Sequence, residues 1–587
     1  MKEFHIVIRS AVSFFALGGL AVALATPVQA DSIPIDSFAK VPNIQSVSMS
    51  ADGENLVALI AAPGSNNEDT ALATWDLNDL ERGPVITPSG DRMKFIAANA
   101  LKADKLLVFG RQEWTGRLGG CGEGRATGAE ATFIVKPYLT DVEHSDFEEA
   151  FADNTRRLGV SQDTQRCLEI AGTASLVNSL PLDPENVIIS QLNSLTFQSN
   201  YYLYNVRTGD TEMLLSASGR AAPGLFNPRN GELLTRSQIE PDGSNEFIQK
   251  VLIRNADTGE FDVHEPLSRP LSERYTVNIV GMDEATGKFY VLTDLFSDRV
   301  EAWMYDPKTR AFDDEPLVAH PEFSIGSIIL GSRPSNFNQI LGFTIAGGGF
   351  ETVYTDPTMA GIQQGLENAF SGQNVSITGY NDDMSRVLFT TGSHRHPTTY
   401  HLLIDRQRVM TLGNSRPWID PEEIGEQRWV TYEARDGLKI PAILDLPAGW
   451  TKDDGPLPTI IHPHGGPWAR DVMGWDSSGW VPFLTSRGYA VLRPQYRGSA
   501  GLGRELWLAG DRQWGLAMQD DKDDGAAWLV EEGIADPDRI AIFGYSYGGF
   551  AAVAATVREN SPYQCALAGA PVADLTRLGN SWSDNRL

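Results

Sequence analysis

A weak internal repeat between residues 45 and 415 constrains the fold of this chain more than any other feature. Short β-rich runs follow turns rich in Asp, Asn and Gly, as at 227–231 before 232–234, 283–287 before 289–292, and 380–383 before 386–389. The repeat length of about 45 residues is typical of the blades of a β-propeller rather than of a helical solenoid. About 370 residues at that spacing correspond to seven or eight blades. We predict a β-propeller of about seven blades over residues 31–425, with a large β-sandwich as the alternative.

The pattern changes near residue 427, after which strands and helices alternate. The predicted strands are 429–432, 440–446, 459–462, 489–493, 539–543 and 564–569, and the predicted helices are 482–487, 520–532 and 550–558. Strands that alternate with helices indicate a mostly parallel sheet with helices on both faces. We therefore assign residues 426–587 to a second domain.

The second domain contains a serine motif in a strand-to-helix setting. Gly-Tyr-Ser-Tyr-Gly at 544–548 follows a predicted strand and precedes a predicted helix, as in the nucleophile elbow of an α/β-hydrolase. The serine in such a turn has a strained backbone, and the flanking glycines are needed because side chains there would clash. We predict Ser546 as the catalytic nucleophile. The amides of Tyr547 and Gly465 are predicted to form the oxyanion hole.

Five motifs of the second domain resemble those of the prolyl oligopeptidase family of serine peptidases. They are His-Gly-Gly-Pro at 464–467, Gln-Tyr-Arg-Gly-Ser at 495–499, Gly-Leu-Gly at 501–503, Asp-Pro-Asp-Arg at 536–539 and Gly-Tyr-Ser-Tyr-Gly-Gly at 544–549. The chain is most similar to the acylaminoacyl-peptidase and dipeptidyl-peptidase-like branches. The resemblance implies a propeller before an α/β-hydrolase domain. It also implies cleavage of short peptides through an acyl-enzyme on Ser546, with the propeller restricting access to the site.

The acid and the base of a catalytic triad are not found where this fold places them. Their order in an α/β-hydrolase is Ser, then Asp or Glu, then His. Only 41 residues follow Ser546, and none of the nine histidines is among them. A further strand-helix-strand unit needs roughly 30 residues. We expect an incomplete hydrolase domain that lacks the triad Asp and His, so that the chain as given is an inactive fragment of a longer peptidase.

Two further expectations follow from the missing residues. His464 lies near the predicted oxyanion loop and is the upstream histidine that could serve as a rearranged base. The last predicted strand, 564–569, is expected to leave an uncovered sheet edge. Two other functions also stay open: a non-enzymatic binding protein that uses its propeller and carries an inactive hydrolase remnant, and an esterase of the same fold.

The first thirty residues have the pattern of a secretory signal peptide. Lys2 and Arg9 form a basic head, residues 11–25 are apolar, and small residues at 28–30 offer a cleavage point before Asp31. Fifteen apolar residues are fewer than the roughly 20 needed to span a bilayer. We predict an exported protein, periplasmic or secreted, with no membrane attachment after cleavage.

The three cysteines are too few for a disulfide-stapled fold. Cys121 and Cys167 could pair in an oxidising compartment, with two free buried thiols as the alternative. Cys565 lies in an apolar run and is expected to be a small core residue.

Charge and histidine placement bear on partners and metals. Acidic residues outnumber basic ones by 76 to 48, for a formal net charge of −28. Such a chain has little means of neutralising phosphates, so nucleic acid is not expected as a partner. His394 and His396 share a face of a predicted strand, but His401 lies on the opposite face and no suitable Cys or carboxylate accompanies them. We predict no metal and no cofactor, and a peptide as the substrate.

Overall fold

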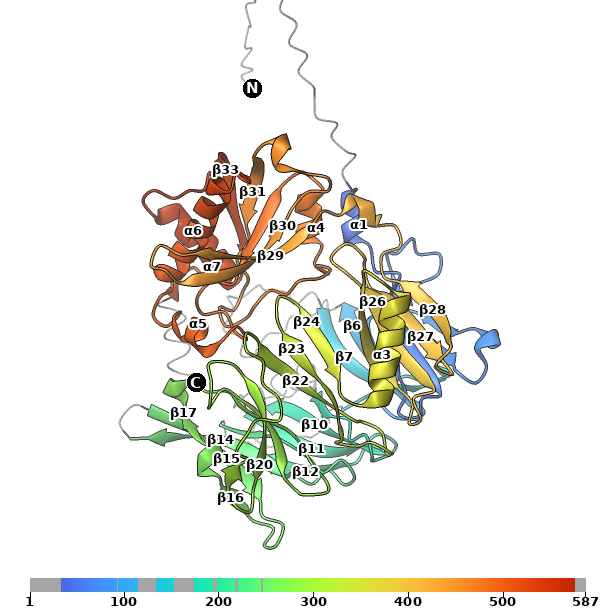
Figure 1. Ribbon diagram of the computed structural model, residues 1–587. Coiled ribbons are helices and arrows are strands. Elements are labelled where there is room, and N and C mark those ends of the chain that lie inside the picture. The colour runs from blue at the N-terminus through green and yellow to red at the C-terminus, as the bar shows by residue number, and fades with distance from the viewer. Residues whose placement is uncertain are drawn as a thin grey trace, which may run out of the picture.

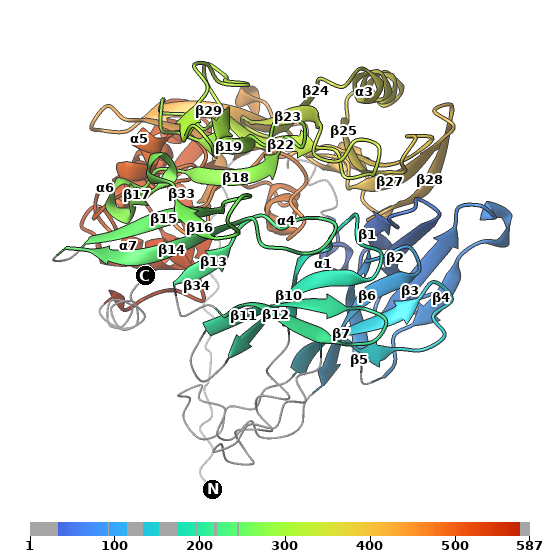
Figure 2. The same ribbon diagram turned by 90° about the horizontal axis from the view of Figure 1, so that it is seen from below.

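The structure is a computed structural model that describes residues 33–91, 93–113, 133–151, 174–193, 198–216, 220–243 and 246–575. The predicted signal peptide, Cys121 and Cys167 lie outside these residues. Figures 1 and 2 show two parts, a ring of small antiparallel sheets and a larger sheet flanked by helices. No helix in the described part of the chain is both long and apolar enough to cross a membrane.

The first four sheets of the ring run in chain order from residue 44 to residue 270. Their strands are β1 (Ile44–Met49), β2 (Asn55–Ala61), β3 (Thr70–Asp76) and β4 (Val85–Pro88); β5 (Met93–Ala100), β6 (Lys105–Glu113), β7 (Phe133–Asp141) and β8 (Glu148–Glu149); β9 (Ala174–Asn178), β10 (Asn186–Asn193), β11 (Gln198–Asn205) and β12 (Thr211–Ser216); and β13 (Ala221–Pro223), β14 (Thr235–Asp242), β15 (Glu246–Arg254), β16 (Phe261–Val263) and β17 (Arg269–Pro270).

Three more sheets complete the ring, so the described residues form seven blades and the prediction of a propeller of about seven blades is confirmed. These strands are β18 (Val277–Met282), β19 (Phe289–Thr293), β20 (Glu301–Asp306) and β21 (Ala311–Phe312); β22 (Ser324–Leu330), β23 (Ile340–Ala346) and β24 (Phe350–Tyr354); and β25 (Asn374–Tyr380), β26 (Arg386–Gly392), β27 (Thr399–Ile404) and β28 (Arg408–Asn414). Helix α3 (Pro357–Ala369) follows the three strands of the sixth blade.

Middle strands of several blades contain runs of buried apolar residues because neighbouring blades cover both of their faces. All five residues of β19 are buried, and four consecutive residues of β2 are buried. Side chains from adjacent blades share clusters; Leu56 of the first blade, for example, packs in one cluster with Leu388 of the seventh. The turns between strands stay polar and exposed, which is why the repeat is visible in the sequence.

The hydrolase sheet has the order β29 (Gln427–Glu433), β30 (Lys439–Asp445), β32 (Ala490–Pro494), β31 (Leu457–Ile461), β33 (Ala535–Tyr545) and β34 (Cys565–Gly569). The pairings of β31 with β32, β31 with β33 and β33 with β34 are parallel, and the two pairings of β30 are antiparallel. Its helices are α4 (Trp480–Thr485), α5 (Arg504–Leu508), α6 (Ala517–Glu531) and α7 (Tyr547–Val557). This agrees with the predicted mostly parallel sheet.

Several short helices lie between the strands of each domain and at the junction of the two domains. Helix α1 (Ile35–Ala39) precedes the first blade, and Phe38 packs edge-on against Phe483 of α4 in the hydrolase domain. The remaining short helices are η1 (Leu80–Arg82), η2 (Glu265–Leu267), η3 (Leu271–Glu273), η4 (Pro421–Glu423) and η5 (Lys452–Asp454). The predicted domain division at 425/426 falls between the end of β28 and the start of β29.

Cys565 was predicted to be buried, and that prediction is wrong. β34 pairs with β33 alone among the described residues, so it forms the edge of the sheet. Ala566 packs beneath α7, whereas Cys565 is exposed and its alternate neighbour Leu567 is 49% exposed. Because successive side chains of a strand point to opposite faces, Cys565 and Leu567 lie on the face that α7 does not cover.

Candidate active site

Ser546 lies at a sharp turn between β33 and α7. Its backbone has φ 59° and ψ −118°, a left-handed conformation that costs a residue with a Cβ atom free energy. The Ser546 amide donates to the carbonyl of Gly569 (2.9 Å), and the Ser546 carbonyl accepts from the amide of Phe550 (3.0 Å). The turn is therefore fixed on one side by β34 and on the other by the first turn of α7.

The two glycines that flank Ser546 have no room for a side chain. A Cβ atom on Gly544 would lie 2.3 Å from the carbonyl carbon of Gly548, and one on Gly548 would lie 2.2 Å from the carbonyl oxygen of Pro463. Both contacts are with backbone, which cannot rotate away. The end of β33, the start of α7 and the loop after β31 approach one another closely, so the motif has glycine at positions 544 and 548.

Gly465 lies directly opposite Ser546, on the loop that follows β31. A Cβ atom on Gly465 would be 3.5 Å from Ser546 Cβ and 3.4 Å from the carbonyl oxygen of Tyr545. The structure thus brings together the three residues predicted for one site, because Tyr547 follows Ser546 at the start of α7. Helix α7 begins there, three residues earlier than predicted, so its N-terminus faces the site.

His464 is held by the loop and not aimed at Ser546. Its Nε2 lies 2.9 Å from Ser499 Oγ, and its Nδ1 lies 2.7 Å from the carbonyl oxygen of Gly465. The Tyr496 hydroxyl donates to the carbonyl oxygen of His464 (2.8 Å). Burial lowers the pKa of His464. These bonds make His464 a fixed part of the loop that contains Gly465.

The other histidine of this region is also engaged elsewhere. His462 Nδ1 lies 2.6 Å from the carbonyl oxygen of Phe543, and its ring stacks on the Phe543 ring with centroids 4.9 Å apart. No histidine in the described part of the chain forms a hydrogen bond with Ser546. The geometry therefore gives no support to an upstream base.

The Tyr547 side chain packs beneath the site in an aromatic cluster. Its ring lies 5.4 Å from that of Tyr496 and 4.8 Å from that of Trp514, measured between centroids. The ammonium of Lys522 lies over this cluster, 5.3 Å from the Tyr547 centroid, and burial lowers its pKa to about 7. Lys522 was not among the predicted site residues; it stands among four Asp residues at 520–524.

Exposed aromatic side chains border Ser546. Trp480 and Tyr545 are 39% and 53% exposed, and their ring centroids are 6.2 Å apart. Trp468, three residues beyond Gly465, is 41% exposed. Exposed rings of this size beside a nucleophile give apolar contact area to a bound substrate.

The histidines considered as metal ligands lie apart from the site. His394 and His396 belong to the connection between β26 and β27, not to a strand as predicted, because the chain turns at Ser393 and His396. His401 is buried in β27 between Thr391 (3.0 Å) and Thr411 (3.2 Å). Within the described residues, no three His, Cys, Asp or Glu side chains are grouped in a way that could hold a metal ion.

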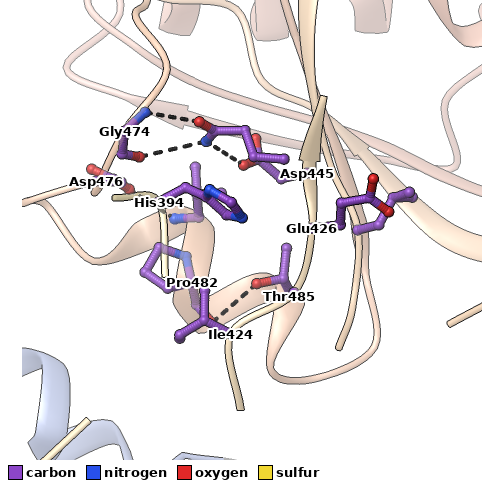
Figure 3. Close-up of a pocket in the computed structure, with 12 residues that line it drawn as sticks. His394, Ile424, Glu426, Asp445, Gly474, Asp476, Pro482 and Thr485 are labelled. Carbon is purple, nitrogen blue, oxygen red and sulfur yellow. Dashed lines mark hydrogen bonds between the residues drawn. The ribbon is translucent and has the colours of Figure 1, made fainter. Parts of the chain in front are cut away.

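A small cavity of about 20 Å³ lies between the domains, lined by His394 from the propeller and by residues of the hydrolase domain (Figure 3). Gln427 donates to Asp445 Oδ1 (2.7 Å) and accepts from the Gly474 amide (2.8 Å). Asp445 also forms a buried ion pair with Arg493 (3.0 Å). The volume suits a single water molecule. None of the predicted site residues lines this cavity.

Comparison with known proteins supports the same interpretation. Residues 475–584 match the model of the prolyl oligopeptidase family. Dipeptidyl aminopeptidase BIII of Pseudoxanthomonas mexicana is 31% identical over 216 residues, which are 36% of this chain and 31% of that protein. Dipeptidyl peptidase family member 6 of Caenorhabditis elegans is 25% identical over 440 residues, which are 70% of this chain and 57% of that protein. The matched parts are therefore less than two thirds of the length of either relative.

A solved structure from a study of two prolyl endopeptidases has the same fold. It superposes with a TM-score of 0.60 at 14% identity, covering 93% of this chain and 76% of that one. Propeller and hydrolase domain are both included in that coverage. This likeness shows the fold, and the family model together with the curated relatives identifies the hydrolase domain as one of the prolyl oligopeptidase family.

Proposed function

We propose that this protein is a serine peptidase that hydrolyses peptide bonds of short peptides through an acyl-enzyme on Ser546. The observation that carries the proposal is the position of Gly465 directly opposite the strained turn at Ser546. A carbonyl carbon attacked by Ser546 Oγ would place its oxygen between the amides of Gly465 and Tyr547. These two donors would bind the developing oxyanion, aided by the N-terminus of α7.

The reaction would proceed in two steps. Ser546 Oγ forms a bond to the peptide carbonyl carbon, and the C–N bond breaks to release the amine with a proton. Water then attacks the acyl-enzyme, releases the carboxylic acid and restores the hydroxyl. Each step needs a base that takes a proton and returns it.

The propeller is proposed to limit which peptides reach Ser546. The loop that contains Gly465 continues to Arg470, whose guanidinium donates to backbone carbonyls of the sixth blade. The loop that follows β31 therefore contacts the ring, and Figure 1 shows the hydrolase domain lying against the propeller. Peptides short enough to pass between the two domains would be the substrates.

The upstream histidines of the hydrolase domain are bonded to other groups. His462 Nδ1 lies 2.6 Å from the carbonyl oxygen of Phe543, and His464 Nε2 lies 2.9 Å from Ser499 Oγ. We infer that neither histidine is the base that takes the proton of Ser546. The proposed reaction needs another base for this step, oriented by an acid.

Reaction with a fluorophosphonate tests the proposal. The wild-type protein is expected to be labelled at Ser546 and to cleave short peptides, and Ser546→Ala is expected to do neither. Hydrolysis of esters without peptides would identify an esterase instead. A folded wild-type protein that is neither labelled nor active would favour a binding role for the propeller.

We also propose that the protein is exported. The support is the basic head, the apolar run at 11–25 and the small residues at 28–30. N-terminal sequencing of protein from the native host is expected to begin at Asp31; a chain that still begins at Met1 would contradict export by cleavage.

A further inference from the structure

The loop that contains Gly465 is fixed at its far end by both domains. Within the hydrolase domain, the Ala469 carbonyl accepts from the Ala500 amide (2.9 Å). The side chain of Gln495 bridges the backbone of Asp471, accepting from its amide (3.1 Å) and donating to its carbonyl (2.8 Å). The segment from 469 to 473, which these bonds hold, also touches the propeller.

The contact on the propeller side is the turn between β23 and β24, which contains three successive glycines. Arg470 donates to the carbonyl oxygens of Ala346 (3.3 Å) and Gly347. The amide of Met473 donates to the carbonyl oxygen of Gly348 (2.8 Å). The contact is thus made by propeller backbone, which cannot adjust as a long side chain could.

Of the three glycines of this turn, Gly348 is the one that lies closest to the hydrolase domain. A Cβ atom on Gly348 would lie 3.0 Å from the Trp429 ring and 3.1 Å from Met473 Sδ. The turn therefore fits between a strand of the hydrolase sheet and the loop after Gly465. Replacing the hydrogen at Gly348 would push one of the two away.

The hydrogen bonds of the Arg470 side chain go to backbone carbonyl groups and not to a carboxylate. Its hydrogen bonds go to backbone carbonyls of both domains, including Gly501 (3.4 Å) and Asp471 (3.4 Å). Burial lowers the pKa of Arg470. A half-buried cation that is bonded only to carbonyl groups still has a desolvation penalty, which well-placed hydrogen bonds offset.

We propose that Arg470 is a positioning residue that joins the loop of Gly465 to the sixth blade, so that the oxyanion hole is held in place by the docked propeller. The inference rests on the proposed function, because it assigns Gly465 to that hole. It makes the propeller a structural part of the catalytic site as well as a barrier to large substrates. If the propeller moved away from the hydrolase domain, the loop would lose its support at Arg470, which is five residues after Gly465.

The chain offers a matched control for Arg470. Arg504 also joins the domains through propeller backbone, donating to the carbonyl oxygen of Glu273 through Nη2 (2.7 Å) and Nε (3.2 Å). Its guanidinium lies 4.1 Å from the Tyr275 ring centroid. The Arg504 side chain forms no hydrogen bond with residues 463–474. Arg504→Met therefore removes a similar contact between the domains without touching the loop.

The experiment compares Arg470→Met with Arg504→Met by two measurements. Hydrogen exchange of the peptide 463–474 is expected to become at least tenfold faster in R470M and to stay unchanged in R504M. For peptide hydrolysis, kcat is expected to fall at least tenfold in R470M with KM within twofold, since a displaced donor acts on the transition state. Arg470→Lys, which keeps one donor, is expected to lie between wild type and R470M.

Equal exchange in R470M and R504M would overturn the proposal, as would faster exchange with an unchanged kcat. If R470M does not fold, Gly348→Ala tests the same contact from the propeller side and is expected to show the same two effects. If the wild type has no activity, the proposed peptidase function fails, and the exchange rates alone then decide whether Arg470 fixes the loop.

Discussion

The ammonium of Lys522 lies 3.6 Å from the centroid of the Tyr496 ring, in a cluster closed to solvent. Its hydrogen bond goes to the carbonyl oxygen of Met518 (2.5 Å). The neighbouring Asp521 is paired with Arg497 (2.8 Å) and does not form an ion pair with Lys522. The cation is thus stabilised by aromatic faces and one carbonyl, which is a weak substitute for water.

We predict that Lys522→Met makes the protein more stable at neutral pH. Burial lowers the pKa of Lys522 from 10.5 to about 7, so the unfolded chain holds this proton more tightly than the folded one. The penalty is fully present below pH 7 and is relieved as pH rises from 7 to 10.5. The variant, which has no group to titrate, is expected to lose this rise.

Urea unfolding of both proteins between pH 6.5 and 10 measures the effect. The stability advantage of K522M is expected to be largest at the acidic end and to shrink as pH rises. Lys452→Met is the control, because Lys452 is 59% exposed and pairs with Glu532 at the surface. A constant difference between wild type and K522M across this range would contradict the lowered pKa.

The backbone at Ser546 predicts a difference between two substitutions that both remove the hydroxyl. Ser546 has φ 59°, which glycine adopts freely and alanine does not. Ser546→Gly is expected to be more stable than Ser546→Ala by about 1 kcal/mol, since strain at such positions costs about 1–3 kcal/mol and glycine loses some entropy. Denaturant unfolding checks this value. Equal stability of the two variants would show that the turn is not strained.

Gly548, in the turn that holds Ser546, has much less free space around it than Gly361 in helix α3. Gly548→Ala places a methyl group 2.2 Å from the Pro463 carbonyl oxygen, whereas a Cβ atom on Gly361 in α3 meets nothing within 4 Å. We expect G548A to lower the stability by several kcal/mol, on the order of an overpacked core position, and G361A to raise it by about 0.5–1 kcal/mol through helix propensity. Thermal unfolding of both variants measures the contrast. Similar melting temperatures would contradict the close packing at Gly548.

How much the sequence predicts depends on whether a feature is local. The seven blades and the elbow at Ser546 follow from short patterns of apolar residues, glycines and turns, and the sheet of the second domain follows from strands alternating with helices. The exposure of Cys565 was missed because it depends on what covers one face of β34. The loop at His394 was missed because two histidines two apart suit a strand and a turn equally well.

Features that join distant segments had no signal in the sequence. Lys522 stands among several Asp residues in the sequence, and only the fold places its ammonium close to the rings of Tyr496 and Tyr547. In the same way, Arg470 and Gly347 are more than a hundred positions apart, and neither residue type suggests their contact. Burial of a charge is decided by tertiary packing, which no local pattern reports.

We predict that the stability of the propeller depends on pH through His401. Burial lowers the pKa of His401 to about 4, and its ring stacks on Phe389 with centroids 4.9 Å apart. Since the folded pKa is below the unfolded value near 6.5, stability from the neutral ring is complete above pH 6.5 and is lost as pH falls toward 4. His401→Gln removes the titration while keeping a polar group for Thr391 and Thr411. Melting curves between pH 7 and 4 are expected to fall less steeply with acid for H401Q, and identical slopes would exclude His401 as the source.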